Sequence, residues 1–193
     1  GTFTVGNVLT INTGSYTLTG GNLSITASLH LATDTTASLT QSGGMLDAGR
    51  QALIGAGAGG NGIYTLSGGT LAGDFIDVAV IGNSAGTLEI SGGTVSARVD
   101  LVVGSDDSTH GRVIQTGGTV NVLSPAFGLY VNGSYQLSNA NGPALLSVTH
   151  DAVIGDTLSG SLMVLEARAS ESRPGMGLVR SRWTTVNQHG QPV

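Results

Sequence analysis

The aspartates are the residues of this sequence whose type and spacing could do chemistry. Carboxylates that converge on one face, with an arginine or lysine nearby, can act as general acid and base on glycosidic bonds. We aligned the chain on an apolar run that recurs and usually ends in glycine. In this alignment one position, four residues before the glycine where a glycine is present, is occupied in successive repeats by Gln51, Val78, Asp100, Phe127 and Asp151. Because a phenylalanine separates Asp100 from Asp151, we expect no converging pair and assign no catalytic residue.

Further aspartates and the histidines are candidates for acid–base or metal chemistry. Four aspartates fall in predicted corners or loops, namely Asp74, Asp77, Asp106 and Asp107. Aspartate is common in corners and loops because its carboxylate accepts hydrogen bonds from nearby backbone amides. We assign this structural role to all four aspartates. The spacing of the histidines fits no metal site; they are His30, His110, His150 and His189. We therefore predict no metal-binding residue and no cofactor.

The pair Asp106-Asp107, with Ser105 and Ser108 beside it, is the strongest candidate for a cation site. The Gly-Gly-x-Gly-x-Asp nonapeptide of calcium-binding β-rolls is absent from the chain. We interpret the pair as a solvated polar turn and predict no calcium site. The glycine-rich run at residues 55–62 lacks the Lys-Ser/Thr and the helix of a phosphate-binding loop, so we interpret it as a flexible corner insertion.

Three tyrosines return at one position of a repeat. Tyr16, Tyr64 and Tyr135 share this position, and other copies carry Leu39, Leu88 and Val113 at or near it. A continuous exposed aromatic stripe would indicate carbohydrate binding. An interrupted stripe instead predicts packing in the core or at an edge.

The loops between the second and third segments of the repeat are the predicted recognition surface. Their expected lengths vary, because they run from Gly55 to Gly62, Gly82 to Gly86 and Gly104 to Gly111. Variable loops on one edge of a repeat protein are where binding is usually found. The partners that we expect there are glycans or cell-surface proteins. We also expect self-association, end to end or along an edge.

A regular repeat positions all of these side chains. A Ser/Thr-Gly-Gly step occurs five times, and its first glycines are Gly20, Gly43, Gly68, Gly92 and Gly117. Three short segments in each repeat are rich in Val, Ile, Leu and Thr and are too short for helices. The first follows the glycines, as at 70–71, 94–95 and 119–122. The second is the apolar run, at 52–55, 79–82, 101–104 and 152–155, and the third ends at the next glycines, at 63–66, 87–90, 112–115 and 134–137.

The length of this repeat distinguishes between two all-β architectures. A hairpin meander would repeat its pattern every 8–12 residues, roughly half of what is seen. A return after about 24 residues predicts that each repeat makes one turn and pairs with the turns above and below. We therefore predict a parallel β-helix (β-solenoid) of about six to seven three-strand rungs over residues 1–155. A C-terminal antiparallel-like β segment or cap over 156–193 completes the predicted fold.

A family resemblance supports this architecture. The stretch Gly-Thr-Leu-Glu-Ile-Ser-Gly-Gly-Thr-Val (86–95), then Leu-Val-Val-Gly (101–104) and Gly-Arg-Val-Ile-Gln-Thr-Gly-Gly-Thr-Val (111–120), resembles autotransporter passenger repeats. Repeats of bacterial surface adhesins are similar, and the resemblance covers about residues 10–155. It implies a stalk or passenger region of a secreted or surface protein, located outside the cell or on the bacterial cell surface.

The C-terminal segment has a different composition. Residues 156–193 hold four of the seven arginines and the only tryptophan. Ser-Glu-Ser-Arg-Pro-Gly-Met-Gly-Leu-Val (170–179) and Val-Asn-Gln-His-Gly-Gln-Pro-Val (186–193) resemble part of the MaoC-like hotdog dehydratases, as does Gly-Asp-Thr-Leu (155–158). The aspartate–histidine dyad of that family has no counterpart here, so the resemblance implies no catalytic residue. The segment is either a chimeric junction or a β-cap in which Arg180 and Arg182 alternate with other residues, as in an edge strand.

Composition and charge exclude several functions. The formal net charge is −5 and the chain has no lysine, so a nucleic-acid surface is not expected. The absence of cysteine excludes disulfides and thiolate metal sites. No apolar run approaches the roughly 18 residues of a membrane helix. We therefore predict a non-catalytic structural or adhesive module, with two alternatives: a divergent polysaccharide-active β-helix enzyme, or a chimeric chain with a non-functional hotdog fragment.

Overall fold

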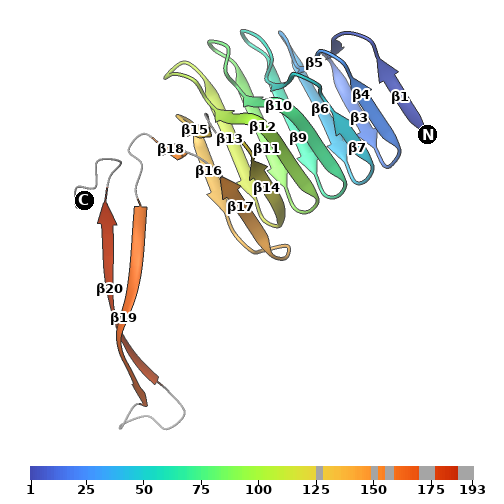
Figure 1. The fold of residues 1–193 in the computed structure, drawn as a ribbon. Helices are drawn as coiled ribbons and strands as arrows, with labels where there is room; N and C mark the ends of the chain where they lie inside the picture. The colour runs from blue at the N-terminus through green and yellow to red at the C-terminus, as the bar shows by residue number, and fades with distance from the viewer. Residues whose placement is uncertain (125–127, 149–151, 155–158, 170–176, 187–193) are drawn as a thin grey trace. The chain divides into compact units, whose positions relative to one another are not determined.

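The fold is built from strands alone in the part of the chain that can be described. The computed structural model describes residues 1–124, 128–148, 152–154, 159–169 and 177–186. These residues form 20 β-strands and no helix. The chain divides into two compact units, Gly1–Val153 and Ile154–Val193. The first unit is a β-solenoid of about six turns, which follow one another from blue to orange in Figure 1.

The turns of the solenoid contribute strands to three faces, and in two of the turns one long strand, β10 or β12, bends to serve both the first and the second face. The first face contains β1 (Thr2–Val5), β4 (Asn22–Ile25), β7 (Met45–Asp47), β10 (Thr70–Val78), β12 (Thr94–Val103), β14 (Gly118–Val122) and β17 (Ala144–Val148). The second face contains β2 (Leu9–Ile11), β5 (Ser28–Leu31), β8 (Gln51–Ile54), the second halves of β10 and β12, β15 (Leu129–Val131) and β18 (Ala152–Ile154). The third face contains β3 (Gly14–Leu18), β6 (Thr36–Gln41), β9 (Asn61–Leu66), β11 (Ala85–Ile90), β13 (His110–Gln115) and β16 (Ser134–Leu137).

Neighbouring turns pair in parallel, and their register preserves the period that the glycine steps predict. On the first face, Leu71 lies beside Leu46 on one side and Val95 on the other. On the third face, Leu88 lies between Tyr64 and Val113. The predicted all-β parallel solenoid is therefore confirmed.

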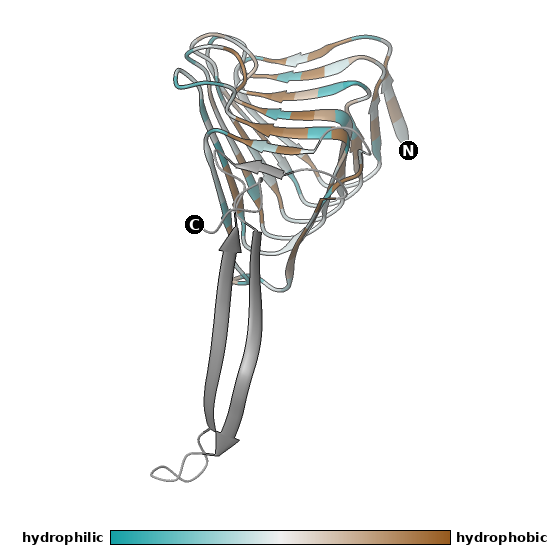
Figure 2. Cartoon of the chain, turned by 60° about the vertical axis from the view of Figure 1, so that its left-hand side comes forward, coloured by the Kyte–Doolittle hydropathy of each residue, from teal (hydrophilic) through white to brown (hydrophobic). Residues whose placement is uncertain are grey.

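The core forms because alternate side chains of each strand point inward. In β11, Leu88 and Ile90 are buried whereas Glu89 between them is exposed. On the second face, Ile54, Val78 and Val103 stack on successive turns and are fully buried. Figure 2 shows the resulting alternation of hydrophobic and hydrophilic residues along the strands. Neighbouring turns thus cover one another's aliphatic residues, which no single turn could bury alone.

The second strand of the fourth turn differs from the sequence prediction. We predicted it at 79–82, but it is the second half of β10 and places Phe75 beside Gln51 and Asp100. Ala79 takes the place of Gly55 and Gly104 after the strand, with φ of 54° where the glycines have 77° and 70°. The Ala79 amide donates to a carbonyl of the preceding turn, as the amides of Gly55 and Gly104 do. Alignment on Gly82 was wrong because an alanine here adopts the left-handed conformation that favours glycine.

A glutamine–tyrosine pair occurs twice inside the third face, buried at Tyr64 and partly buried at Tyr135. The Tyr64 hydroxyl donates to Gln41 Oε1 at 2.5 Å, and the Tyr135 hydroxyl donates to Gln115 Oε1 at 2.6 Å. The amide nitrogen of Gln41 donates to backbone carbonyls of Gly44 and Thr70. Burial raises the pKa of both tyrosines. The prediction that this interrupted aromatic column packs in the core is confirmed for Tyr64, which is fully buried.

Substitution of Tyr64 by phenylalanine is expected to lower the free energy of unfolding by about 2 kcal/mol, because it leaves the buried Gln41 oxygen without its donor. Urea denaturation of the whole chain measures the effect. Tyr16→Phe is the matched control, since Tyr16 occupies the same column but is 50% exposed. Equal effects of the two substitutions would contradict the assignment of a stabilising role to the buried hydrogen bond.

The second unit contains a long antiparallel hairpin. Strand β19 (Ser159–Ala169) pairs with β20 (Gly177–Val186), with a register shift between Val164 and Glu166. The antiparallel β segment predicted for this region is confirmed.

Candidate functional site

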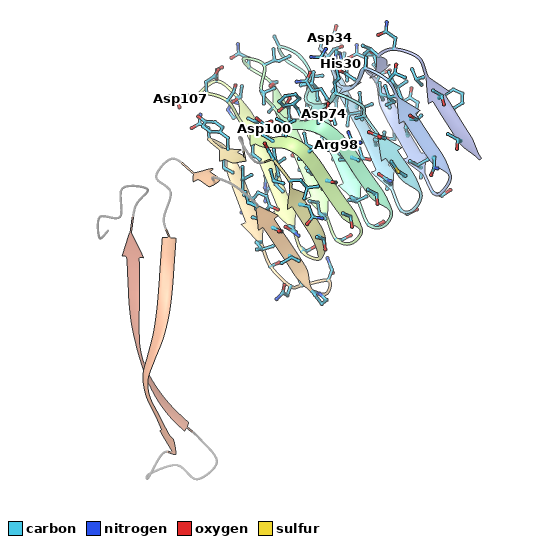
Figure 3. The ribbon with its side chains drawn as sticks, viewed as in Figure 1. His30, Asp34, Asp74, Arg98, Asp100 and Asp107 are labelled. Carbon is cyan, nitrogen blue, oxygen red and sulfur yellow. The ribbon has the colours of Figure 1, made fainter. Side chains whose placement is uncertain are left out.

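An arginine and two aspartates from three successive turns meet where the first face bends into the second. The Arg98 guanidinium donates to both carboxylate oxygens of Asp47 at 2.8 Å and to Asp74 Oδ1 at 3.2 Å. It also donates to the carbonyl of Gly49 at 3.2 Å. Asp74 was predicted to accept local backbone bonds, whereas the ion pair that it makes is with the next turn (Figure 3). Acidic and basic residues therefore do converge on adjacent turns, which the sequence search missed.

This ion cluster is expected to contribute modestly to stability. The Arg98 side chain is 40% exposed, and solvent screens such pairs. Arg98→Gln is expected to lower the free energy of unfolding by about 1 kcal/mol at low salt, and by less at high salt. Denaturation curves at two ionic strengths measure it. The control is Arg112→Gln, because the one side-chain hydrogen bond of Arg112 within the described residues is to the neutral Gln136, at 3.3 Å. An Arg98 effect that does not change with salt would contradict an ionic origin.

The second face carries a pair of carboxylates on neighbouring turns. Asp77 lies within β10 and is 5% exposed, so its predicted position in a corner or loop is wrong. The amide nitrogen of Gln51 donates to Asp77 Oδ2 at 2.5 Å. Burial, with a smaller contribution from the charge of Asp100, raises the pKa of Asp77 to about 6. Burial also raises the pKa of Asp100, whose buried Oδ1 has no hydrogen-bond partner among the described residues.

A shallow pocket of about 260 Å³ lies beside these carboxylates on the second face. Ser28, Arg50, Gln51 and Phe75 line it. The register places Gln51 between Ser28 and Phe75, and Phe75 next to Asp100. The pocket combines a guanidinium, an amide, a hydroxyl and a half-buried aromatic ring. Such a combination can bind the hydroxyl groups and the apolar face of a sugar.

Three stacked loops form a ridge where the second face bends into the third. They are residues 55–60, 79–84 and 104–109, and we call them the corner ridge. All three contain six residues, so the variable lengths predicted for them from the glycine positions are wrong. The corresponding loops of the flanking turns, 12–13, 32–35 and 132–133, are shorter.

Hydrogen bonds join the three loops to one another. The Gly59 amide donates to the Asn83 carbonyl at 3.2 Å, and the Asn83 amide donates to the Ser108 carbonyl at 3.1 Å. The Ser105 hydroxyl donates to the Val80 carbonyl at 2.9 Å. The corner ridge is therefore a continuous surface in which each loop supports its neighbour.

The predicted polar turn at the outer loop of the ridge is confirmed for Asp106. Its carboxylate accepts from the Ser108 amide at 2.8 Å and from the Ser108 hydroxyl at 2.6 Å. These bonds lower the pKa of Asp106. Asp107 is exposed next to it (Figure 3). Within the described residues no three His, Cys, Asp or Glu side chains are grouped so as to hold a metal ion.

The remaining candidates are dispersed or fall outside the described residues. His30 lies in β5 on the second face, where burial lowers its pKa, and His110 is exposed at the start of β13. Phe127, His150, Asp151 and His189 lie outside the described residues. In the part of the chain that the structure covers, no helix is long and apolar enough to cross a membrane. Comparisons of this β-solenoid chain with models of protein families, with curated proteins and with solved structures give no match.

Proposed function

We propose that the chain is a non-catalytic structural and adhesive module, a stalk or passenger region of a bacterial secreted or surface protein. The observation that carries the proposal is the corner ridge, in which three loops of equal length are held by hydrogen bonds on a stack of parallel strands. The resemblance of residues 86–120 to autotransporter passenger repeats supports the same location, outside the cell or on its surface. In this proposal the solenoid serves as a stalk, and the exposed residues of the corner ridge bind the ligand.

The ligands that we propose for the ridge are glycans or cell-surface proteins. Ile81 is 40% exposed, and Asn83 and Asp107 are exposed on the same ridge. His110 is exposed directly after its outer loop. An exposed aliphatic side chain beside groups that can form hydrogen bonds offers a ligand both apolar and polar contacts. The convergence of Asp47 and Asp74 on Arg98 supports a structural role for these carboxylates, since hydrogen bonds already occupy them.

Binding of the whole chain to a glycan array and to intact cells tests this proposal. Ile81→Asp in the corner ridge is expected to reduce binding at least tenfold. Leu145→Asp is the matched control, because Leu145 is 57% exposed on the first face, away from the ridge. Loss of binding by the control alone, or binding that neither substitution affects, would place recognition elsewhere.

The second candidate function is a divergent polysaccharide-active enzyme. It is favoured by the raised pKa of Asp77, the neighbouring Asp100 and the pocket that Arg50 lines. A carboxyl group whose pKa is raised toward neutral pH can act as a general acid. Incubation with acidic and neutral polysaccharides tests this candidate, and bond cleavage that Asp100→Ala abolishes would overturn the non-catalytic proposal.

A further inference from the structure

The sequence contains three Asn-Gly pairs, and all three asparagines are exposed. They are Asn61, Asn132 and Asn141. An asparagine that precedes glycine can lose ammonia without an enzyme, because the backbone nitrogen of the glycine attacks the side-chain carbonyl carbon and no side chain on the glycine hinders the approach. The attacking nitrogen must lose its proton, so it must be free of a strong hydrogen bond and open to its surroundings. The fold therefore determines which of the three pairs can react.

Backbone pairing protects the first two pairs. Gly62 lies within β9, which pairs with β6 on one side and with β11 on the other, so its amide belongs to the hydrogen-bonded ladder. A Cβ atom built on Gly62 would collide with the Gly55 nitrogen. The Gly133 amide donates to the Val103 carbonyl at 2.8 Å, and a Cβ atom built on Gly133 would collide with the Gly111 carbonyl oxygen. Both nitrogens are thus hydrogen-bonded and enclosed by neighbouring turns.

The third pair lies in a longer corner, the loop that joins β16 to β17 in Figure 1. Residues 138–143 form it, whereas the corresponding corners of earlier turns are 42–44, 67–69, 91–93 and 116–117. Within the described residues the Gly142 amide donates only to the Asn139 carbonyl, at 3.4 Å, which is longer than the usual range of about 2.7–3.2 Å. A Cβ atom built on Gly142 would meet no atom within 4 Å. The nitrogen of Gly142 is therefore weakly bonded and open.

The contacts of Asn141 place its side chain beside this nitrogen without enclosing it. The Asn141 amide donates to the Thr116 carbonyl at 2.8 Å, which fixes the backbone just before Gly142. Asn141 Nδ2 donates to the Thr116 hydroxyl at 2.8 Å. This side-chain bond is exposed, so water can replace it at little cost when the side chain rotates toward Gly142.

We propose that Asn141 is a site of spontaneous deamidation, with the Gly142 nitrogen as the nucleophile. A bond forms between this nitrogen and Asn141 Cγ, the bond between Cγ and Nδ2 breaks, and the amide proton of Gly142 leaves with Nδ2 as ammonia. One water molecule then opens the resulting succinimide to aspartate or isoaspartate at position 141. Either product adds one negative charge to the corner beside Thr116 and removes the Nδ2 donor. The inference does not depend on the proposed function, because the corner ridge shares no residue with this site.

The test compares the three asparagines within one protein. The full chain is incubated folded at mildly alkaline pH, which favours loss of the amide proton, and in parallel unfolded in urea. Peptide mapping by mass spectrometry follows deamidation of Asn61, Asn132 and Asn141. In the folded chain we expect Asn141 to react at least tenfold faster than the other two. In urea we expect the three rates to become similar, because the pairing that protects Gly62 and Gly133 is lost.

Release of ammonia by the folded chain provides a second measurement. Asn141→Gln is expected to remove most of it, because glutamine would have to close a larger ring, although its amide can still donate to Thr116. Asn132→Gln is the matched control and is expected to leave the release unchanged. Equal rates of the three asparagines in the folded chain would overturn the proposal, as would equal ammonia release by the two variants. A faster reaction of Asn141 that persists in urea would also overturn it, because the cause would then be the flanking sequence and not the fold.

Discussion

Gly69→Ala is expected to destabilise the solenoid by about 4 kcal/mol, the largest effect that we predict for a single methyl group. Gly69 has a φ of 83°, which costs an alanine energy regardless of its surroundings. A Cβ atom here would also lie 2.3 Å from the Gly44 carbonyl oxygen and 2.7 Å from the Gly43 carbonyl carbon. Both are backbone atoms of the turn below, so a side-chain rotation cannot relieve the contact. The turns would have to separate at this corner.

A matched glycine separates the two contributions. Gly59 has a φ of 81°, but a Cβ added there would meet no atom within 4 Å. Gly59→Ala is therefore expected to cost only the conformational strain, about 1 kcal/mol. Urea denaturation of both variants measures the difference. Equal losses would mean that the close stacking of the glycine corners contributes nothing beyond backbone conformation.

Asp77→Asn is expected to stabilise the chain by about 3 kcal/mol at pH 7–8 and to have little effect near pH 4. Burial raises the pKa of Asp77 in the folded protein from an ordinary value of 3.8 to about 6. Each tenfold change in proton affinity corresponds to about 1.4 kcal/mol, which gives the magnitude. Because the folded state binds the proton more tightly, wild-type stability falls as the pH rises from about 4 to about 6, and stays low above that range. Asparagine resembles the protonated side chain and can still accept from Gln51.

Denaturation at several values between pH 4 and pH 8 measures this dependence. The exposed Asp107 provides the control, since Asp107→Asn also removes one negative charge but from the corner ridge. Asp100 also has a raised pKa, so some loss of stability with rising pH is expected to remain in Asp77→Asn. An Asp77→Asn variant that is less stable than the wild type at pH 8 would show that the charged carboxylate is the form that the fold requires.

The sequence predicted the solenoid because the same signals recur in every turn. The Ser/Thr-Gly-Gly steps fixed the period, and alternation such as Leu88, Glu89 and Ile90 fixed which side chains point inward. The prediction was wrong in the fourth turn, where Ala79 adopts the conformation of a glycine. Alignment on Gly82 instead of Ala79 displaced the predicted second strand by three residues. This displacement made the predicted loop lengths unequal and placed Asp77 outside the predicted strand.

The candidate site was less predictable than the fold. Asp74 and Arg98 stand one period of the repeat apart, which was a usable signal for the ion cluster. The contact between Arg98 and Asp47, two turns apart, depends instead on the reach of the guanidinium around the corner. The orientation of Gln41 toward Tyr64 likewise follows from the diagonal offset of two strands, which no local pattern specifies.

By itself the sequence determined the parallel solenoid, the period of its turns, the faces of its strands and the antiparallel segment that follows. Those features follow from periodicity and turn chemistry, which are local properties of the chain. Only the tertiary structure decided that Asp77 is buried, that Arg98 joins three turns and that three equal loops stack into the corner ridge. Each of these depends on which residues of different turns become neighbours. One alanine in a glycine's conformation, Ala79, was enough to make the sequence predict the wrong neighbours in the fourth turn.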